Sequence, residues 1–223
     1  MLGFLPIATL HFLLPKLHKE RCVINPIFDR STNKCLIHTS HSTRKKCKRF
    51  SISVNQDFDK VVSGCHQQHG ISWLYPRLVE SFKHIHQGSM MATIFDDNYP
   101  HKPIGSCRVR LYSIEVWDAL TGELAAGELG YSVGNIYTSL TGFTLTDGAG
   151  SVQLATLGVL LCKNDFETWD LGMDLEYKRR MGAMNLDRSH FVSLVKASRE
   201  FPHDIFLPNM ERCNCKDVMD QLL

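Results

Sequence analysis

Three strand-like runs follow one another between residues 112 and 146, with short glycine-containing turns between them. The first, YSIEVWDA, precedes Thr121-Gly122, and the second, ELAAGELGYSV, precedes Gly134-Asn135. The third is IYTSLTGFTLT. Turns this short connect neighbouring antiparallel strands. The sequence therefore predicts an antiparallel meander, and the rest of the chain has to pack around that sheet.

Helical and strand patterns alternate on both sides of this meander. Before it, we expect a strand over 50–54 and amphipathic helices over 57–67 and 76–87. Residues 90–111 suggest a strand followed by a long loop, with an insertion near 96–110. After it, Ser151 is expected to cap an apolar helix, which a strand and a charged helix follow. This order predicts an α+β fold, a mixed sheet flanked by helices.

The N-terminal segment is apolar, but it lacks the marks of a targeting or membrane segment. No basic residue precedes the apolar run, no small-residue cleavage site follows it, and Pro6 and Pro15 interrupt it. We interpret it as a buried strand or packing arm. Residues 25–42 are polar and irregular, as is the tail after Pro202. The predicted division is an arm and linker over 1–43, a main domain over 44–201 and a tail over 202–223.

Charge is almost balanced, with 25 basic and 23 acidic side chains, so a nucleic-acid site would need a local cluster. One cluster places five cations within six residues: Arg44, Lys45, Lys46, Lys48 and Arg49. It could contact RNA phosphates, although charge runs are more often solvated surface. The run at 178–180 has the composition of an ordinary exposed helix.

The cysteines and histidines point away from metal chemistry. The eight cysteines form no Cys-x-x-Cys pair, and the eleven histidines form no His-Glu-x-x-His motif. We expect no metal, no disulfide scaffold and reduced thiols in a cytoplasmic protein.

Six segments between about His38 and Val195 carry a resemblance to one family. They are HTSHSTRKKCKRFSISVN, FDKVVSGCH, ISWLYPRLVESFKHIHQG, SIEVW, ELAAGELGYSVGNIYTSLTGFT and TWDLGMDLEYKRRMGAM. Together they resemble the leucyl/phenylalanyl-tRNA–protein transferases. The resemblance implies an acetyltransferase-like fold and an enzyme that moves a Leu- or Phe-type amino acid from aminoacyl-tRNA to an N-terminal Arg or Lys, marking that protein for degradation. Residues 1–43 would then be the remnant of the family's N-terminal domain.

The resemblance also implies roles for particular residues. Asp170 would be catalytic, orienting the attacking amine or accepting its proton, although an Asp at a strand end also binds turns. The basic cluster would bind tRNA. The predicted substrate-binding residues are Trp73, Glu128, Tyr137, Thr141, Phe143 and Gly172, and aromatic residues on strands are otherwise most often core.

Three positions depart from the family pattern. The family's Glu falls at Leu140, its Gln falls at Gly172, and a position that is typically apolar falls at Glu128. A buried Glu128 would reject Leu or Phe and favour a cationic amino acid, but we slightly prefer an outward orientation for this side chain.

Two alternatives stay open. The turn from Gly148 to Ser151 could cradle a pyrophosphate, which would make the protein an acyl-CoA-dependent N-acetyltransferase. Leu140 and Gly172 would instead fit an inactive relative that still binds tRNA or a peptide. If the protein is instead the transferase that the resemblance implies, its partners are aminoacyl-tRNA and an acceptor protein with a basic N-terminal residue. We expect no cofactor, no membrane contact and a monomer.

Overall fold

The computed structural model describes residues 4–8, 12–72, 74–207 and 211–220. Its elements, in chain order, are β1 (Phe4–Ala8), β2 (Leu13–Leu17), β3 (Glu20–Ile24), β4 (Phe28–Asp29), β5 (Lys34–Cys35), α1 (His41–Lys46), the 3₁₀ helix η1 (Cys47–Arg49), β6 (Phe50–Val54), α2 (Phe58–His69), α3 (Pro76–Gln87), β7 (Met90–Phe95), β8 (Pro103–Asp118), β9 (Leu124–Val133), β10 (Ile136–Thr144), α4 (Ala149–Lys163), β11 (Thr168–Gly172), α5 (Glu176–Arg180), β12 (Met184–Asp187), α6 (Arg188–Ser198), β13 (Cys213–Asn214) and α7 (Cys215–Asp220).

Within the described residues, the main sheet has nine strands and contains the predicted meander. Its order is β12-β3-β11-β10-β9-β8-β6-β13, with β7 paired to β8. β8 pairs antiparallel with β9 and β9 with β10, whereas β10 pairs parallel with β11. The meander is therefore confirmed, and so is the α+β class, a mixed sheet flanked by helices in the manner of acetyltransferases.

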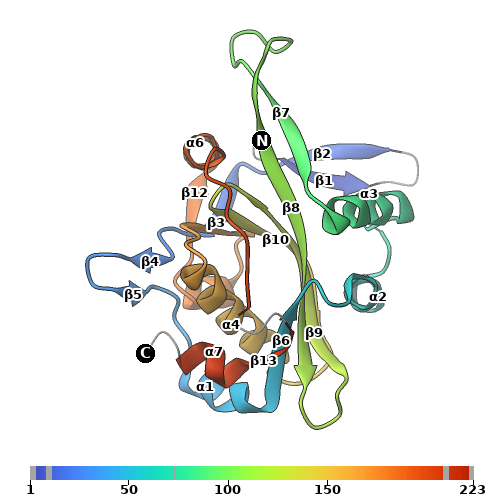
Figure 1. The fold of residues 1–223 in the computed structure, drawn as a ribbon, viewed down its shortest axis with the longest axis vertical. Coiled ribbons are helices and arrows are strands. Elements are labelled where there is room, and N and C mark those ends of the chain that lie inside the picture. The colour runs from blue at the N-terminus through green and yellow to red at the C-terminus, as the bar shows by residue number, and fades with distance from the viewer. Residues whose placement is uncertain (1–3, 9–11, 73, 208–210, 221–223) are drawn as a thin grey trace.

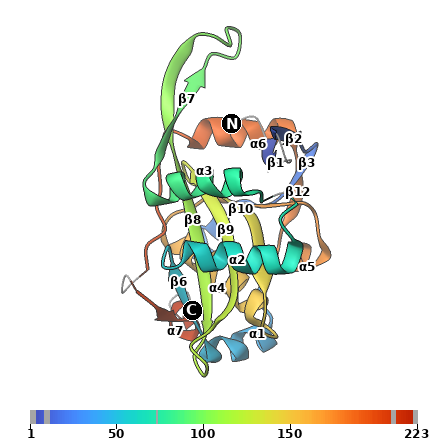
Figure 2. The same ribbon diagram turned by 90° about the vertical axis from the view of Figure 1, so that its right-hand side faces the viewer.

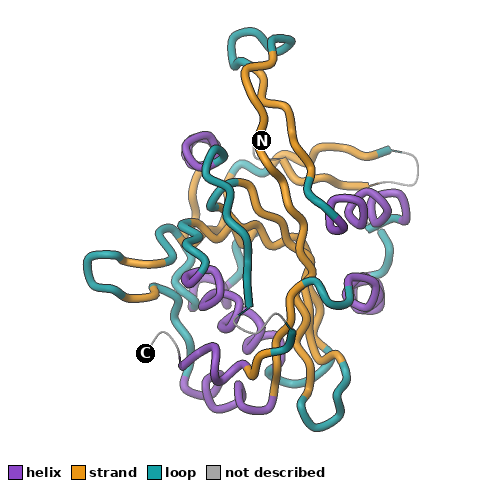
Figure 3. Tube along the Cα trace, in the orientation of Figure 1, coloured by secondary structure: helices purple, strands orange, loops and turns teal. Residues whose placement is uncertain are grey.

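The helices cover both faces of this sheet. α4 lies on one face beside α1 and α7, while α2 and α3 lie on the other (Figures 1 and 2). The helix and strand colours of Figure 3 show the same layers. The predicted helices at 57–67 and 76–87 are confirmed as α2 and α3. α3 begins with Pro76, whose fixed φ suits the first turn of a helix.

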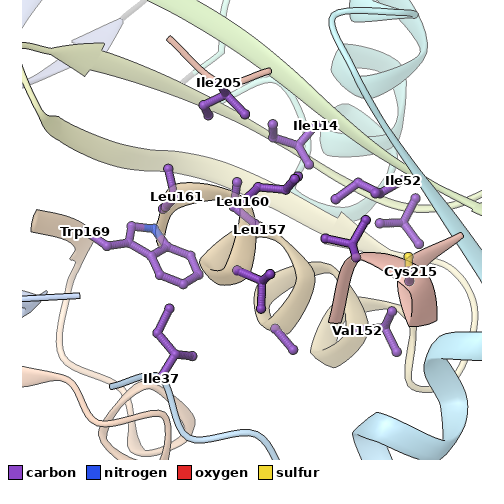
Figure 4. Packing of buried hydrophobic residues seen from close by; sticks show 14 of the residues in the cluster. Ile37, Ile52, Ile114, Val152, Leu157, Leu160, Leu161, Trp169, Ile205 and Cys215 are labelled. Atoms are coloured by element: carbon purple, nitrogen blue, oxygen red, sulfur yellow. The ribbon is translucent and has the colours of Figure 1, made fainter. Parts of the chain in front are cut away.

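The largest core cluster surrounds α4, which is apolar on almost every side. Leu157, Leu160 and Leu161 are fully buried there, and Trp169 of β11 packs beside them (Figure 4). A helix that is apolar all round has to be covered on all sides, which the sheet, α1 and α7 achieve. This packing fixes the position of the N-terminal end of α4 relative to β10.

The predicted long loop is wrong from Pro103 onward, where the chain forms β8, whereas the insertion near residues 96–110 stays a prediction. β8 begins at Pro103 and pairs with β7 from the register pair of Phe95 and Pro103 to that of Met90 and Val109. The paired strands form a hairpin that projects beyond the body of the molecule (Figure 1). The outer residues of β8, Pro103–Ser106, are all exposed, so they lack the apolar alternation by which a strand is normally predicted.

The two ends of the chain also form regular structure. β1 and β2 make a separate antiparallel pair, whereas β3 lies inside the main sheet between β11 and β12. In the tail, β13 pairs with β6, and Cys215, Val218 and Met219 of α7 are buried. The division into 1–43, 44–201 and 202–223 stays a prediction. Over the described residues, no helix is long and apolar enough to cross a membrane.

Candidate functional site

A cavity opens where β10 and β11 separate. The two strands pair only from Ile136–Thr168 to Thr138–Asp170, and β10 then continues to Thr144 with an irregularity between Ser139 and Thr141. The N-terminal end of α4 faces this gap. The cavity has a volume of about 550 Å³. It is lined by Gln68, His69, Glu128, Ser139, Leu140, Thr141, Gly142, Phe143, Thr144, Gly148, Gly150, Ser151, Gln153, Leu154, Leu171, Tyr177 and Lys178.

Glu128 forms part of the buried wall of this cavity, and the preferred outward orientation is wrong. Its side chain on β9 is 3% exposed. Oε1 accepts hydrogen bonds from the hydroxyls of Tyr137 and Ser139, each at 2.9 Å, and Oε2 accepts one from Nε2 of Gln153 at 2.7 Å. The inward direction follows from the sheet, because α4 covers this face and supplies Gln153. Strand periodicity alone could not say which face that would be.

The three donors to Glu128 are neutral, so they only partly replace the water that the carboxylate loses. Burial raises the pKa of Glu128 to about 7, against the lowering effect of the three hydrogen bonds. Burial also raises the pKa of Tyr137 well above its usual value, and the adjacent Glu128 adds to this rise. At neutral pH, Tyr137 is therefore a hydrogen-bond donor, and Glu128 is present in both its protonated and its ionised form.

Lys178 supplies a cation to the same cavity, although its sequence context suggested an exposed helix. The side chain is 8% exposed, and Nζ donates to the carbonyl oxygens of Leu171 at 2.6 Å and Met173 at 2.9 Å. Burial lowers its pKa from the usual value. An ammonium has three donors, so within the described structure Lys178 keeps one N–H for a ligand.

Asp170 lies beside the cavity, not in its lining. The carboxylate is fully buried and forms an ion pair with Arg21 of β3, with Nε to Oδ1 at 3.1 Å and Nη2 to Oδ2 at 2.6 Å. It also accepts bonds from Oγ1 of Thr138 at 3.1 Å and from the backbone N–H of Gly172 at 3.0 Å. Asp170 thus joins three neighbouring strands and fixes the end of β11. Its catalytic role stays a prediction.

The other predicted substrate-binding residues fall into different settings. Thr141 and Phe143 line the cavity, and Phe143 is also buried in the core under α2. Tyr137 does not line the cavity itself, but its hydroxyl donates a hydrogen bond to Glu128, which does. Gly172 has φ +79°, and a β-carbon there would meet nothing within 4 Å. Trp73 lies outside the described residues.

The N-terminal end of α4 differs from the expectation that Ser151 is the cap. The helix begins at Ala149, and its N-cap is Gly148 in the left-handed conformation with φ +78°. Ser151 lies within the first turn and lines the cavity. Glycine provides the positive φ that the capping position requires. The Lys46 side chain lies over this turn and bonds to Asp147 at 2.7 Å.

The five residues of the basic cluster occupy α1 and η1 and do not share one environment. Arg44, Lys45 and Lys48 line a second pocket with Lys216 and Asp220. Lys46 is paired with Asp147, and Arg49 is paired with Asp118 at 2.6 Å. The first three are therefore the better placed to meet phosphate groups.

Sequence reasoning missed Arg21, Gln153 and Lys178. Gln153 sits on a helix that looks uniformly apolar, and its polarity at that position was the one available signal. Arg21 is separated from Asp170 by 149 positions, so no local pattern links them. Among the described residues, no group of three or more His, Cys, Asp or Glu side chains could hold a metal ion.

Comparison with known proteins gives matches that cover the cavity and the basic cluster. The family model described as leucyl/phenylalanyl-tRNA protein transferase matches residues 33–196. A protein of that name from Desulfatibacillum aliphaticivorans is 26% identical over 171 residues, covering 74% of this chain and 64% of its own. One from Azotobacter vinelandii is 25% identical, covering 74% and 66%. One from Alkalilimnicola ehrlichii is 22% identical, covering 82% and 62%. The chain thus spans somewhat less than two thirds of the length of these relatives.

Proposed function

Because the chain belongs to the leucyl/phenylalanyl-tRNA–protein transferase family, we propose that it moves an amino acid from aminoacyl-tRNA to the N-terminal Arg or Lys of a protein, which marks that protein for degradation. The observation that carries the proposal is the cavity between β10 and α4, which lies within the matched region. The monomeric state and the cytoplasmic location stay predictions.

The position of the basic cluster supports this proposal. Lys46 ends α1 and reaches the turn at Gly148 that opens α4, so the cluster adjoins the cavity. A tRNA that lies on Arg44, Lys45 and Lys48 can direct its aminoacylated 3′ end into the cavity. Phosphate contacts supply affinity there, while the cavity recognises the aminoacyl group.

The chemistry of the transfer is the attack of an unprotonated α-amine on the ester carbonyl of aminoacyl-tRNA. A new amide bond forms, the ester bond breaks, and the proton lost by the amine ends on the 3′-terminal ribose oxygen or in water. Holding the two reactants together supplies a large part of the rate. The remaining N–H of Lys178 is suited to stabilise the negative charge that develops on the carbonyl oxygen.

Asp170 contributes through position in this proposal. Its bonds to Arg21, Thr138 and the N–H of Gly172 hold the end of β11, whose carbonyl at Leu171 orients Lys178. We expect Asp170→Asn to lower transfer and Asp174→Asn, which changes a partly exposed side chain four positions along the chain, to leave it nearly unchanged.

Transfer of radiolabelled amino acids from a charged total-tRNA pool to peptides that begin with Arg, Lys or Asp tests the proposal. We expect labelled peptide with Arg or Lys at the N-terminus and little with Asp. If the protein binds charged tRNA but labels none of the peptides, the inactive binding protein replaces the enzyme.

An acyl-CoA-dependent N-acetyltransferase is a second candidate, because Gly148, Gly150 and Ser151 line the cavity at the N-terminal end of α4. Backbone N–H groups at such an end favour a phosphate or pyrophosphate. Saturable CoA binding together with acetyl transfer from acetyl-CoA would favour this candidate over the first.

A further inference from the structure

The part of the cavity wall formed by Glu128 differs from a pocket built for a purely apolar side chain. Glu128 is almost completely buried, and the residues that hold it, Tyr137, Ser139 and Gln153, are all polar. Trp169 extends the arrangement by donating its Nε1–H to Oγ of Ser139 at 3.0 Å. These bonds fix the carboxylate in one orientation, so it is a built feature of the wall.

The carboxylate keeps hydrogen-bonding capacity for a ligand. Each carboxylate oxygen can accept about two bonds. Oε1 accepts from Tyr137 and Ser139, whereas within the described residues Oε2 accepts only from Gln153. Lys178 in the same cavity lowers the pKa of Glu128 through its charge, but the hydrogen bonds that its ammonium donates within the described structure go to the carbonyls of Leu171 and Met173 and not to Oε2. A position on Oε2 is therefore left for a donor that arrives with the substrate.

An apolar side chain and a cationic side chain should bind beside Glu128 with different free energies. A Leu or Phe side chain would displace water from Oε2 and offer no hydrogen bond in return, which costs binding free energy. An ammonium or guanidinium would replace that water with a charge-assisted bond and would neutralise the buried carboxylate.

We propose that Glu128 makes this cavity selective for a substrate side chain that carries a cationic group, in preference to Leu or Phe. The proposal rests on the proposed function, because it assumes that substrate side chains enter this cavity. The cationic side chain can come from the aminoacyl donor or from the N-terminal residue of the acceptor. Both sources present the same chemistry to Oε2.

Binding of 3′-aminoacylamino-adenosine analogues tests the donor source without requiring catalysis. Analogues carrying Lys, Arg, Leu or Phe are titrated calorimetrically into wild type, Glu128→Gln and Glu128→Met. We expect wild type to bind the Lys or Arg analogue about fivefold to a hundredfold more tightly than the Leu analogue, since the cost of one unsatisfied buried group corresponds to a factor in this range. Both variants should lose this preference. Glu123→Gln, the same charge change on an exposed turn, should keep it.

The acceptor source is tested in a second arm with dipeptides that begin with Arg, Lys, citrulline or Leu. A charge preference in this arm that disappears in Glu128→Gln would support the proposal and assign the side chain to the acceptor. Circular dichroism and thermal unfolding check that each variant is folded. If Glu128→Met does not fold, Glu128→Gln still provides the test, because glutamine has nearly the same volume as glutamate and keeps one acceptor oxygen.

The outcomes separate this proposal from the proposed function. Transfer from charged tRNA with no charge preference in either arm overturns the role of Glu128 and leaves the transferase intact. A charge preference in binding with no transfer supports Glu128 and contradicts the enzyme. Equal affinities of wild type and Glu128→Gln for every analogue and dipeptide overturn the proposal whether or not transfer occurs.

Discussion

At the scale of single residues, two buried carboxylates lie close to the cavity and have opposite kinds of partner. Asp170 is paired with the guanidinium of Arg21, whereas Glu128 is held by three neutral donors. The ion pair with Arg21 occupies the carboxylate of Asp170 in holding β3 and β11 together. The lack of a bonded cation leaves Glu128, within the described structure, as the carboxylate that a ligand can engage.

Glu128 should make stability depend on pH in a defined window. Its pKa rises from 4.5 to about 7 on folding, so between these values the folded state holds more protons than the unfolded one. Stability is therefore fully present below pH 4.5 and is lost as pH rises through about 7, by at most about 3 kcal/mol. Urea unfolding of wild type and Glu128→Gln at pH 5 and pH 8 measures this.

The free energy of unfolding of Glu128→Gln should increase relative to that of wild type between pH 5 and pH 8, because glutamine carries no charge at either pH. The control Glu123→Gln should track wild type at both values. A difference between Glu128→Gln and wild type that is the same at pH 5 and pH 8 would contradict the burial of an unpaired carboxylate.

Removing only one partner of the buried ion pair between Arg21 and Asp170 should strongly destabilise the fold. Asp170→Ala leaves a buried guanidinium without its counterion, and we expect a loss of about 3–5 kcal/mol in the free energy of unfolding. The double variant Arg21→Met/Asp170→Leu should lose less, since it removes both charges. Equal losses in the single and double variants, measured by urea denaturation, would show that the pair itself does not matter. Asp59→Ala, which breaks an exposed pair with Lys83, serves as the surface control.

At the scale of elements, the strands and helices whose apolar residues recur with a clear period could be predicted from the sequence. The meander from Tyr112 to Thr144 and the helices α2 and α3 show such a period, and α4 is expected from its apolar run; all are present. In the outer part of the β7–β8 hairpin, residues Pro103–Ser106 of β8 are all exposed, so this end of the strand has no alternation to detect. The eight residues of β13 and α7 are too few to show a period, although the core buries several of them.

The site could be predicted only in part for a related reason. Glu128, Thr141 and Phe143 lie on predicted strands, and the structure brings them to one cavity. The face that Glu128 occupies depends on where α4 packs, and the partner of Asp170 depends on β3, 149 positions away. Both are tertiary facts that local spacing does not contain.

β3 should tolerate change poorly, although it lies in the segment 1–43, which the sequence predicts to be an arm and linker outside the main domain. Val23 is fully buried and its register partners are Asp170 and Met184. Val23→Asp places an unpaired charge in the core, so we expect a loss of more than about 3 kcal/mol in chemical denaturation. Ile104→Asp is the matched control, because Ile104 lies on β8 but is 53% exposed. Similar losses in both variants would mean that β3 is not integral to the sheet.

At the scale of the whole molecule, the basic cluster and the cavity adjoin each other at the N-terminal end of α4. The ion pairs of Lys46 and Arg49 leave Arg44, Lys45 and Lys48 as the expected phosphate contacts. Neutralising these three should weaken tRNA binding and flatten its dependence on salt.

For Arg44→Ala/Lys45→Ala/Lys48→Ala, the slope of log K against log salt concentration should become shallower by about 2. Filter binding at several salt concentrations measures it. The control Arg77→Ala/Lys102→Ala removes two exposed cations on α3 and in the β7–β8 loop. An unchanged slope in the triple variant, or an equal change in the control, would place the tRNA elsewhere.

The most direct test of the central claim is single-turnover transfer from a charged total-tRNA pool to an Arg-initiated peptide, with the cavity open and blocked. Ser151→Trp places a bulky ring on an exposed position of the cavity lining, and Lys163→Trp places the same ring at the far end of α4. We predict that wild type and Lys163→Trp transfer label and that Ser151→Trp loses most of it while still binding tRNA. Undiminished transfer by Ser151→Trp, or no transfer by wild type, would contradict the account.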